Sequence, residues 1–539
     1  MANRSDQSLA ALTSVLSSSV VNDLRLSYYF RDSPEQPGGP EDCTGCFGLG
    51  APRVSIPDAG LMFGNPRTLS SVGRRYQITE NLTWQTGRHS LRFGFDWEHA
   101  TQTGSIITQE PAQLTLWAPA RVRQLDPTIP LAASFTTLDD ILLLPLQSFQ
   151  TGVGPGTPLQ RDFRPSRVLD LYRFYGSDTW RVGPRLTVNY GLAWSYEPNA
   201  LNHDLTKPAL VIPILGTDNL QAPAVQAANF SPTLGFAWDA TGDGKTVVRG
   251  GAGRYFDPAG STNSANLSNE RFVLSPLGTG RIVVSGSNIL WNGRALNFRQ
   301  PTSFTGAQLL AILPAIRAEL LGALNPDNRD FALRNIDRSK EGANLFDPFF
   351  ATPYAVHLNL GVQRQLASDL AVSADFVWRQ FVHTFITGID YNRWNSAGGA
   401  VVPACTPQQR TDVHAVCSNG SITFDTTIGR ARYEGLLARL DKRFSRRTQL
   451  LASYALGSYE GTNGTGVGAG FNNDDSFEND GPLPTDRRHV LNLSGFVELP
   501  WRFQVAFSLS AYSRPPFSAY VYRIRRSGEY VRASTDKAR

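Results

Sequence analysis

The stretch that decides the fold follows Pro184 and reads Arg185-Leu-Thr-Val-Asn-Tyr-Gly-Leu-Ala-Trp-Ser-Tyr-Glu197. Its even positions are large and apolar: Leu186, Val188, Tyr190, Leu192, Trp194 and Tyr196. The odd positions between them are small or polar: Thr187, Asn189, Gly191, Ala193 and Ser195. Successive side chains of a β-strand point to opposite faces, so this alternation predicts one apolar and one polar face. A strand of this kind that ends in aromatics is typical of a barrel wall in a lipid bilayer.

The composition agrees with a chain that crosses a membrane as strands. Of 539 residues, 41% are hydrophobic and 18% charged, below the roughly 25% charged of typical soluble domains. No apolar run approaches the roughly 18 residues that a spanning helix needs. The net charge of +5 is small, and the arginines are scattered, whereas nucleic-acid binding requires clustered basic residues. Nucleic acid is therefore not expected as a partner.

The alternation recurs along the chain, mostly as pairs of strands joined by very short turns. We predict a first strand at 22–31 and six pairs: 76–85 with 88–99, 170–181 with 185–197, 229–239 with 246–256, 353–365 with 369–381, 430–444 with 448–459, and 486–499 with 502–513. Gly, Asp and Pro occupy the turns because they supply the required backbone angles.

The other ends of these strands are joined by much longer segments, such as 101–168 and 258–351. Short turns at one rim and long loops at the other are typical of an outer-membrane barrel, with periplasmic turns and extracellular loops. This places Arg185 near the periplasmic rim and Glu197 near the outside, with the apolar face of 186–196 toward lipid. Two loop segments, Leu138–Phe149 and Gly306–Leu324, are predicted as short helices, although they contain Pro145 and Pro314.

Tryptophans recur within a few residues of the predicted turns and loop bases. Such positions suit the aromatic girdles at the two membrane–water interfaces, and the alternative is the core of a soluble protein. We favour the girdle for Trp84, Trp97, Trp180, Trp194, Trp238, Trp378 and Trp501.

The four cysteines form two pairs in segments between strands. Cys405 and Cys417 close a short loop, which predicts a disulfide in an oxidising compartment. Cys43 and Cys46 form a CxxC sequence that could be a redox motif or half of a zinc site. Because no βαβ context, second CxxC or paired His accompanies it, we favour a loop disulfide or two free thiols.

Few motifs carry catalytic or ligand chemistry. Asp243-Gly-Lys-Thr246 resembles the end of a phosphate-binding loop, but Asp239 replaces the required Gly and a strand-like run follows, so a hairpin turn is favoured. The acidic residues of one Gly/Asn-rich loop are candidate metal ligands, with a solvated loop as the favoured alternative: Asp474, Asp475, Glu478 and Asp480. No catalytic constellation is found, so neither an enzyme nor a cofactor is predicted.

Several stretches together carry a family resemblance. They are Asn81-Leu-Thr-Trp-Gln-Thr-Gly-Arg-His-Ser-Leu-Arg-Phe-Gly-Phe-Asp96, Asn229-Phe-Ser-Pro-Thr-Leu-Gly-Phe-Ala-Trp-Asp239, 242–257 and Asp486-Arg-Arg-His-Val-Leu-Asn-Leu-Ser-Gly495, with the lead-in 21–27. Over most of its length the chain resembles the barrel of TonB-dependent outer-membrane receptors of the Oar-like kind. The resemblance implies a barrel of about 22 strands around a plug. It also implies import of large or scarce solutes, driven by energy relayed through TonB.

The chain departs from that pattern at both ends. We find no plug, TonB box, signal peptide or carboxypeptidase-like sandwich before residue 22, and no terminal aromatic. We therefore expect a fragment with 1–21 as a poorly defined segment, 22–514 as a partial barrel, and 515–539 as a remnant containing a candidate further strand at 520–526. TonB is an expected partner only where a plug and a TonB box lie upstream, and outer-membrane lipid is expected in any case.

The expected fold class is all-β, a transmembrane antiparallel β-barrel of the cell outer membrane that imports an unidentified solute. Two alternatives stay open. A passive porin or surface adhesin would need no plug. A soluble secreted carbohydrate-binding β-protein is compatible with the mean hydropathy of −0.24.

Overall fold

The computed structural model describes most of the chain. The residues outside the description are 1–2, 35–51, 65–66, 109–111, 154–158, 161–168, 199–206, 208, 258–281, 287, 292–293, 299, 323–341, 393–398, 407–408, 410–414, 419–421, 463–479, 517–519, 525–529 and 535–539.

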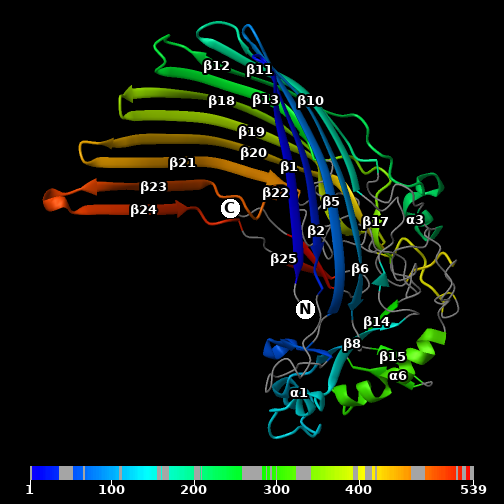
Figure 1. The fold of residues 1–539 in the computed structure, drawn as a ribbon. Helices are drawn as coiled ribbons and strands as arrows, with labels where there is room; N and C mark the ends of the chain where they lie inside the picture. Colours follow the sequence, from blue (N-terminus) through cyan, green and yellow to red (C-terminus); the bar gives the residue numbers. More distant parts are fainter. Residues whose placement is uncertain are drawn as a thin grey trace.

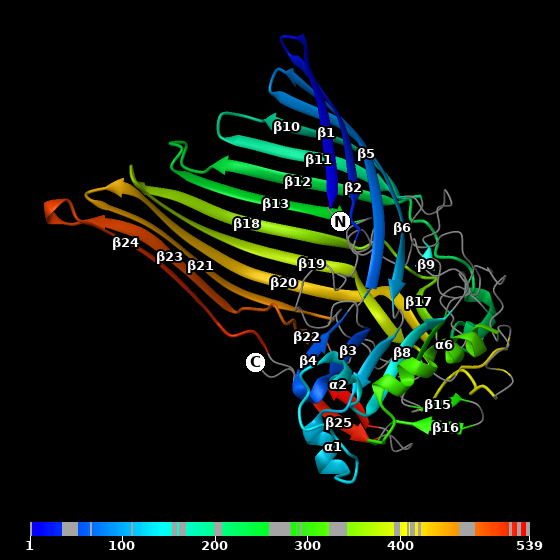
Figure 2. The same ribbon diagram turned by 60° about the horizontal axis from the view of Figure 1, so that its bottom comes forward.

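A large curved antiparallel sheet dominates the molecule (Figures 1 and 2). Among the described residues its 17 strands comprise fourteen long wall strands and three short additions, β9 (Leu159–Gln160), β17 (Gly342–Phe346) and β22 (Gly481–Pro482). In order around the wall, the long strands are β1 (Arg4–Ser17), β2 (Val20–Asp32), β5 (Arg67–Thr86), β6 (His89–Thr108), β10 (Leu169–Arg181), β11 (Leu186–Tyr196), β12 (Asn229–Asp239), β13 (Thr246–Phe256), β18 (Tyr354–Ala367), β19 (Leu370–Asp390), β20 (Ile422–Ser445), β21 (Thr448–Gly461), β23 (His489–Glu498) and β24 (Gln504–Tyr512).

Each wall strand pairs with the next one along the chain, so spatial order and chain order coincide. Within the described residues, β1 pairs only with β2 along this ladder, and β24 pairs only with β23. The wall therefore curves strongly without closing on itself, as Figure 2 shows.

The thirteen predicted strands are all present, and β12 and β13 begin and end at the predicted residues. The N-terminal segment is a correction, because Arg4–Ser17 forms β1 and pairs with β2 from Arg4↔Asp32 to Ser17↔Val20. Pairing with a neighbouring strand outweighs its weak alternation. The candidate strand at 520–526 is present as β25 (Tyr520–Ile524), but it pairs with β26 (Tyr530–Ser534) and not with a strand of the wall.

The register determines which side chains share a face. On β11, Trp194 lies opposite Phe174 of β10, and Leu192 lies opposite Pro232 of β12. Exposed apolar side chains continue across this outer face, with Leu192 at 50% and Phe174 at 48%. The opposite, inner face is polar and lines a hollow on β13, β18, β19 and β20. The alternation predicted for residues 186–196 is thus confirmed.

Three of the long loops fold together into a cap at the long-loop end of the wall (Figures 1 and 2). Its sheet consists of β3 (Arg53–Ile56), β4 (Leu61–Phe63), β7 (Gln113–Leu116), β8 (Leu146–Val153) and β14 (Ile282–Gly286), and its helices are α1 (Pro119–Leu125), α2 (Leu138–Leu142) and α6 (Gly306–Gly322). The cap has its own hydrophobic core, formed by Val54, Ile56, Ala112, Leu114, Leu116, Ala118, Ile141, Leu142, Leu144, Leu146, Phe149, Phe298, Leu309 and Leu313.

The helix predicted near 306–324 is present as α6, with Pro314 inside it. The helix predicted at 138–149 is wrong in its second half, because α2 ends at Leu142 and β8 begins at Leu146. Pro145 has no N–H to continue the helical hydrogen bonds. In the described residues no helix is long and apolar enough to cross a membrane. The remaining short elements are η2 (Pro57–Ala59), η4 (Ala209–Val211), α3 (Ile212–Leu215), η5 (Thr217–Asn219), β15 (Asn288–Trp291), β16 (Arg294–Asn297) and η9 (Pro500–Arg502).

Candidate functional site

The outer face carries an apolar band between two rows of aromatic side chains. Toward the long loops, ring centroids of neighbouring strands lie close together, at 5.1 Å for Tyr28–Tyr76 and 5.9 Å for Phe174–Trp194. Toward the short turns, the exposed tryptophans are Trp84, Trp180, Trp238 and Trp501. None of the seven tryptophans near turns and loop bases is fully buried, which favours the girdle over a core.

The length of the strands suits a bilayer. From Leu186 to Tyr196 the chain makes ten residue steps, or about 34 Å along the strand. With the tilt of about 40° that barrel strands adopt, this covers about 26 Å of thickness, close to the roughly 25 Å apolar band of outer-membrane barrels.

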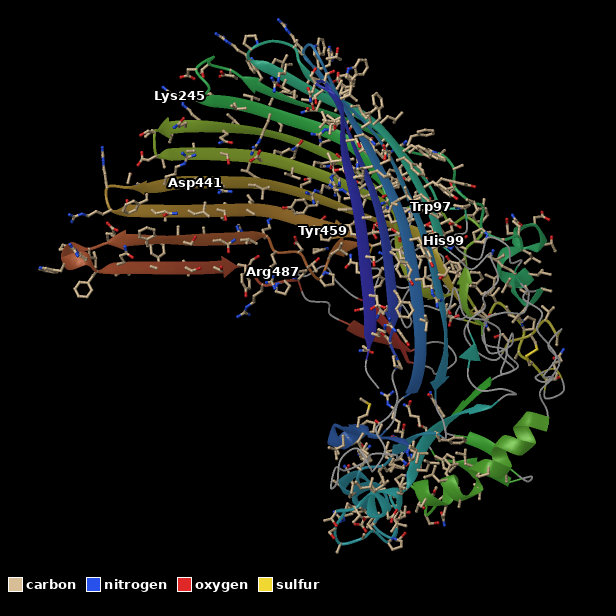
Figure 3. The ribbon with its side chains drawn as sticks, in the orientation of Figure 1. Trp97, His99, Lys245, Asp441, Tyr459 and Arg487 are labelled. Carbon is tan, nitrogen blue, oxygen red and sulfur yellow. A yellow bond between two sulfur atoms is a disulfide. The ribbon has the colours of Figure 1, made fainter. Side chains whose placement is uncertain are left out.

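Two His–Asp pairs lie at opposite ends of the seam between β6 and β10. His89 Nδ1 lies 2.6 Å from Asp178 Oδ2, to which the Tyr190 hydroxyl also donates a hydrogen bond, at 2.8 Å. At the long-loop end, His99 Nδ1 lies 2.8 Å from Asp170 Oδ1. Figure 3 shows His99 beside Trp97, whose ring it stacks against at 5.9 Å. The outer face of β6 between the two histidines carries only apolar side chains: Leu91, Phe93, Phe95 and Trp97.

The inner face is ionic near the short turns. Arg249 on β13 donates two hydrogen bonds, of 3.1 and 3.0 Å, to Asp375 on β19, across the intervening strand β18. This bridge crosses Gly361, where an added Cβ would overlap the Asp375 carboxylate. The same part of the wall encloses a hollow of about 610 Å³, whose lining includes Lys245 and Asp441 (labelled in Figure 3).

The inner face becomes aromatic nearer the long loops. Rings from β13, β18, β19, β20 and β21 contact one another in a continuous row. The members of this row, here called the inner aromatic row, are Tyr255, His357, Phe381, Tyr433 and Tyr459. The wall therefore has lipid-facing aromatic girdles outside and a graded polar and aromatic surface inside.

Comparison with known proteins agrees with this geometry. A family model described as an outer membrane beta barrel domain matches residues 1–511. The chain belongs to this family. The protein is accordingly a transmembrane outer-membrane β-barrel, and lipid surrounds its apolar band. No curated protein matches it at a significant level.

Solved structures similar to this outer-membrane barrel include the outer membrane transporter YddB from Escherichia coli, with 12% identity over 99% of this chain and 61% of that chain, at a TM-score of 0.48. Others are the ferric-catecholate import receptor Fiu from E. coli K12 (12% identity, 94% and 53% covered, TM-score 0.41) and the siderophore receptor PiuA from Acinetobacter baumannii (11%, 95% and 57%, 0.42). The chain spans about 61% of the length of YddB. The family model, and not these structures, carries the assignment.

A second cluster of loops lies outside the membrane-spanning part of the barrel. Its core consists of Leu210, Val211, Leu345, Val402, Ile422 and Phe424. Lys207 in this region is only 7% exposed, and its Nζ donates a hydrogen bond of 2.7 Å to the Gln221 carbonyl. Burial lowers the pKa of Lys207 to about 8, against a smaller opposing effect of Asp347. Burial also raises the pKa of the Tyr391 phenol. These loops therefore hold an amine that is easily neutralised.

Of the site residues predicted from the sequence, some lie in the described part of this outer-membrane barrel and others do not. Cys405 and Cys417 form a disulfide in the loop segment before β20. Asp480 is engaged by its neighbours, with Arg430 Nε at 2.9 Å and the Thr462 hydroxyl at 2.7 Å. Asp474, Asp475 and Glu478 lie outside the described residues, as do Cys43 and Cys46. Within the described ranges no cluster of three or more His, Cys, Asp or Glu could hold a metal.

The Asp243-Gly-Lys-Thr246 stretch, which resembles the end of a phosphate-binding loop, belongs to a hairpin turn between β12 and β13. The Asp239 carboxylate accepts hydrogen bonds from the N–H groups of Gly242 and Gly244, both at 2.9 Å. Both glycines have positive φ, of 77° and 73°, which explains their presence in the turn. The inner aromatic row and the His–Asp seams were missed from the sequence, because both depend on the register between strands.

Proposed function

We propose that the chain is the barrel portion of a TonB-dependent importer, which takes up a solute through the outer membrane. The observation that carries this proposal is the combination of a chemically graded inner face with a folded cap at the long-loop end of the wall. A cap with a hydrophobic core holds its surface loops in fixed positions, and fixed loops suit selective capture of a scarce solute.

A passive porin or a surface adhesin is the competing function. A porin needs a water-filled lumen and no coupling protein, whereas an importer of the proposed kind contacts TonB at its periplasmic side. The soluble secreted alternative does not fit a chain of an outer-membrane family. TonB contact and passive conductance therefore separate the two remaining functions.

The test uses the product of the whole gene, purified from outer membranes. Its expected behaviour is chemical cross-linking to the purified periplasmic domain of TonB, with no steady conductance in planar bilayers bathed in KCl. A steady, ungated KCl conductance together with absence of cross-linking would overturn the proposal in favour of a porin. Outer membranes from cells lacking the gene serve as the control for both arms.

A further inference from the structure

The inner aromatic row runs across five adjacent strands without interruption. Tyr255 and His357 have ring centroids 4.9 Å apart, and Phe381 lies 6.4 Å from His357. The row continues to Tyr459, 6.0 Å from Phe381, and to Tyr433, 6.4 Å from Tyr459. The sequence separates these five rings widely, so only the wall brings them together (Tyr459 is labelled in Figure 3).

Glycines allow two of these rings to lie along the wall. A Cβ at Gly253 would come within 2.7 Å of the Tyr255 hydroxyl. On β20 and β21, a Cβ at Gly435 or Gly457 would come within 2.5 or 3.0 Å of the Tyr433 hydroxyl. Side chains in place of these glycines would push the tyrosines away from the backbone. With glycine there, the rings lie against the strands on the inner face.

One cation lies in the middle of the row. Arg379 on β19 is the register partner of His357 on one side and of Tyr433 on the other, so it shares the inner face with them. Its side chain is exposed, and no hydrogen bond or ion pair engages its guanidinium within the described part of the chain. The acid four residues away on the same face, Asp375, is already held by two hydrogen bonds from Arg249. Among the residues that the structure describes, the positive charge among the rings thus has no partner.

We propose that the inner aromatic row with Arg379 is a binding site for an anionic solute that carries a flat ring, of the aromatic carboxylate class. The rings stack against the flat face, and the guanidinium pairs with the carboxylate through two parallel hydrogen bonds. A cationic solute is disfavoured by Arg379, and a neutral one leaves the guanidinium unpaired. This inference rests on the proposed import function, because it names the solute class that the barrel admits.

The test measures binding of 2-naphthoate to the full chain in amphipol by isothermal titration calorimetry. Two further probes dissect the site: 2-naphthylmethanol keeps the ring without the charge, and cyclohexanecarboxylate keeps the charge without the flat ring. Arg379→Gln is expected to weaken naphthoate binding roughly tenfold or more, because a charge-assisted hydrogen bond is lost. Arg379→Lys retains the charge, and we expect it to restore part of the affinity.

Arg439→Gln is the matched control, since Arg439 also lies on the inner face but pairs with Asp441 at 3.1 Å, away from the rings. It should leave the naphthoate affinity unchanged. Tyr433→Leu should weaken 2-naphthoate by a few-fold and leave cyclohexanecarboxylate nearly unchanged. Equal affinities of wild type and Arg379→Gln for naphthoate, or equal affinity of the wild type for naphthoate and naphthylmethanol, would overturn the inference.

These outcomes are separable from those of the import test. Naphthoate binding that depends on Arg379, without cross-linking to TonB, would remove the importer and keep the site in a passive barrel. Cross-linking to TonB without such binding would keep the importer and remove this solute class.

Discussion

The wall and the cap are built by one chain under opposite rules of burial. In the cap, fourteen apolar side chains come together in a core, and Val54, Leu114 and Leu146 are fully buried. In the wall, large apolar side chains point outward, and Leu360 of β18 is 56% exposed. The cap is held by the hydrophobic effect in water, whereas the wall is held by the hydrogen-bonded ladders between neighbouring strands, which satisfy backbone groups that lipid cannot. The comparison teaches that the same substitution should act differently in the two regions.

The largest expected effect is a charge in the cap core. Leu114→Asp places a carboxylate at a fully buried site, and we expect it to destabilise the cap by about 4 kcal/mol or more. Limited proteolysis should then cleave the cap loops, while the wall keeps its heat-dependent gel mobility. The matched control is Leu143→Asp in the same cap, because Leu143 is 53% exposed. Loss of the wall's mobility shift in Leu114→Asp would show that the two regions are not independent.

The second-largest expected effect is that of a charge on the lipid-facing side of the wall. Leu436→Arg on β20 places a guanidinium on the lipid-facing side, between Phe376 of β19 and Leu456 of β21, at an expected cost of about 2–4 kcal/mol. Leu437→Arg on the same strand is the control, because Leu437 lies on the inner face, opposite Asp375. Urea unfolding in lipid vesicles should separate the two variants. Equal losses of stability would contradict the assignment of the faces.

A single added methyl group should break the ionic bridge on the inner face and lower the stability of the wall. Gly361→Ala introduces a Cβ that overlaps the Asp375 carboxylate, so the bridge to Arg249 must open. We expect a loss of about 1–3 kcal/mol of unfolding free energy in vesicles. Gly183→Ala, at a turn where a Cβ would meet nothing within 4 Å, should cost much less. An intact stability in Gly361→Ala would mean that the bridge contributes little to the wall.

The smallest effect is a pH dependence confined to the second loop cluster. Because the pKa of Lys207 in the folded protein, about 8, lies below its ordinary value of 10.5, the folded loops bear the cost of a buried charge at pH below about 8. As the pH rises from about 8 to 10.5, the folded state releases its proton first and the loops become more stable. The protection factors of amides 209–220, which are exchange rates corrected for the intrinsic base-catalysed rise with pH, should increase across this interval, and Lys207→Met should abolish the change. Protection factors that fall at high pH would contradict the sign.

The wall could be predicted from the sequence, because its signal is local. A period of two over eleven residues, as at 186–196, specifies a strand and both of its faces. β1 escaped prediction because its faces are mixed: the outward register that includes Leu12 also carries Ser8 and Ser14, and its inward register carries Leu9. Evidence for β1 comes from its pairing with β2, and not from its own sequence pattern.

The cap and the candidate sites could not be predicted in the same way. The cap core brings together residues that are far apart in the sequence, such as Val54, Leu114 and Leu309. No local sequence pattern indicates that they pack against one another. In the sequence, Arg379 is one of many scattered arginines. Only the strand register shows that it lies between His357 and Tyr433. The disulfide joins Cys405 and Cys417, which are 12 positions apart, a separation short enough for the pairing to be predicted from the sequence.

The central claim is that β11 has one face in lipid and the other in water, and a cysteine scan from 187 to 195 tests it most directly. Single cysteines, in a Cys43→Ser and Cys46→Ser background, would carry nitroxide labels in reconstituted vesicles. The account predicts that oxygen dissolved in lipid relaxes the labels at 188, 190, 192 and 194. A water-soluble nickel chelate should relax those at 187, 189, 191, 193 and 195. Uniform access of the chelate to every position, or alternation of the opposite phase, would contradict it.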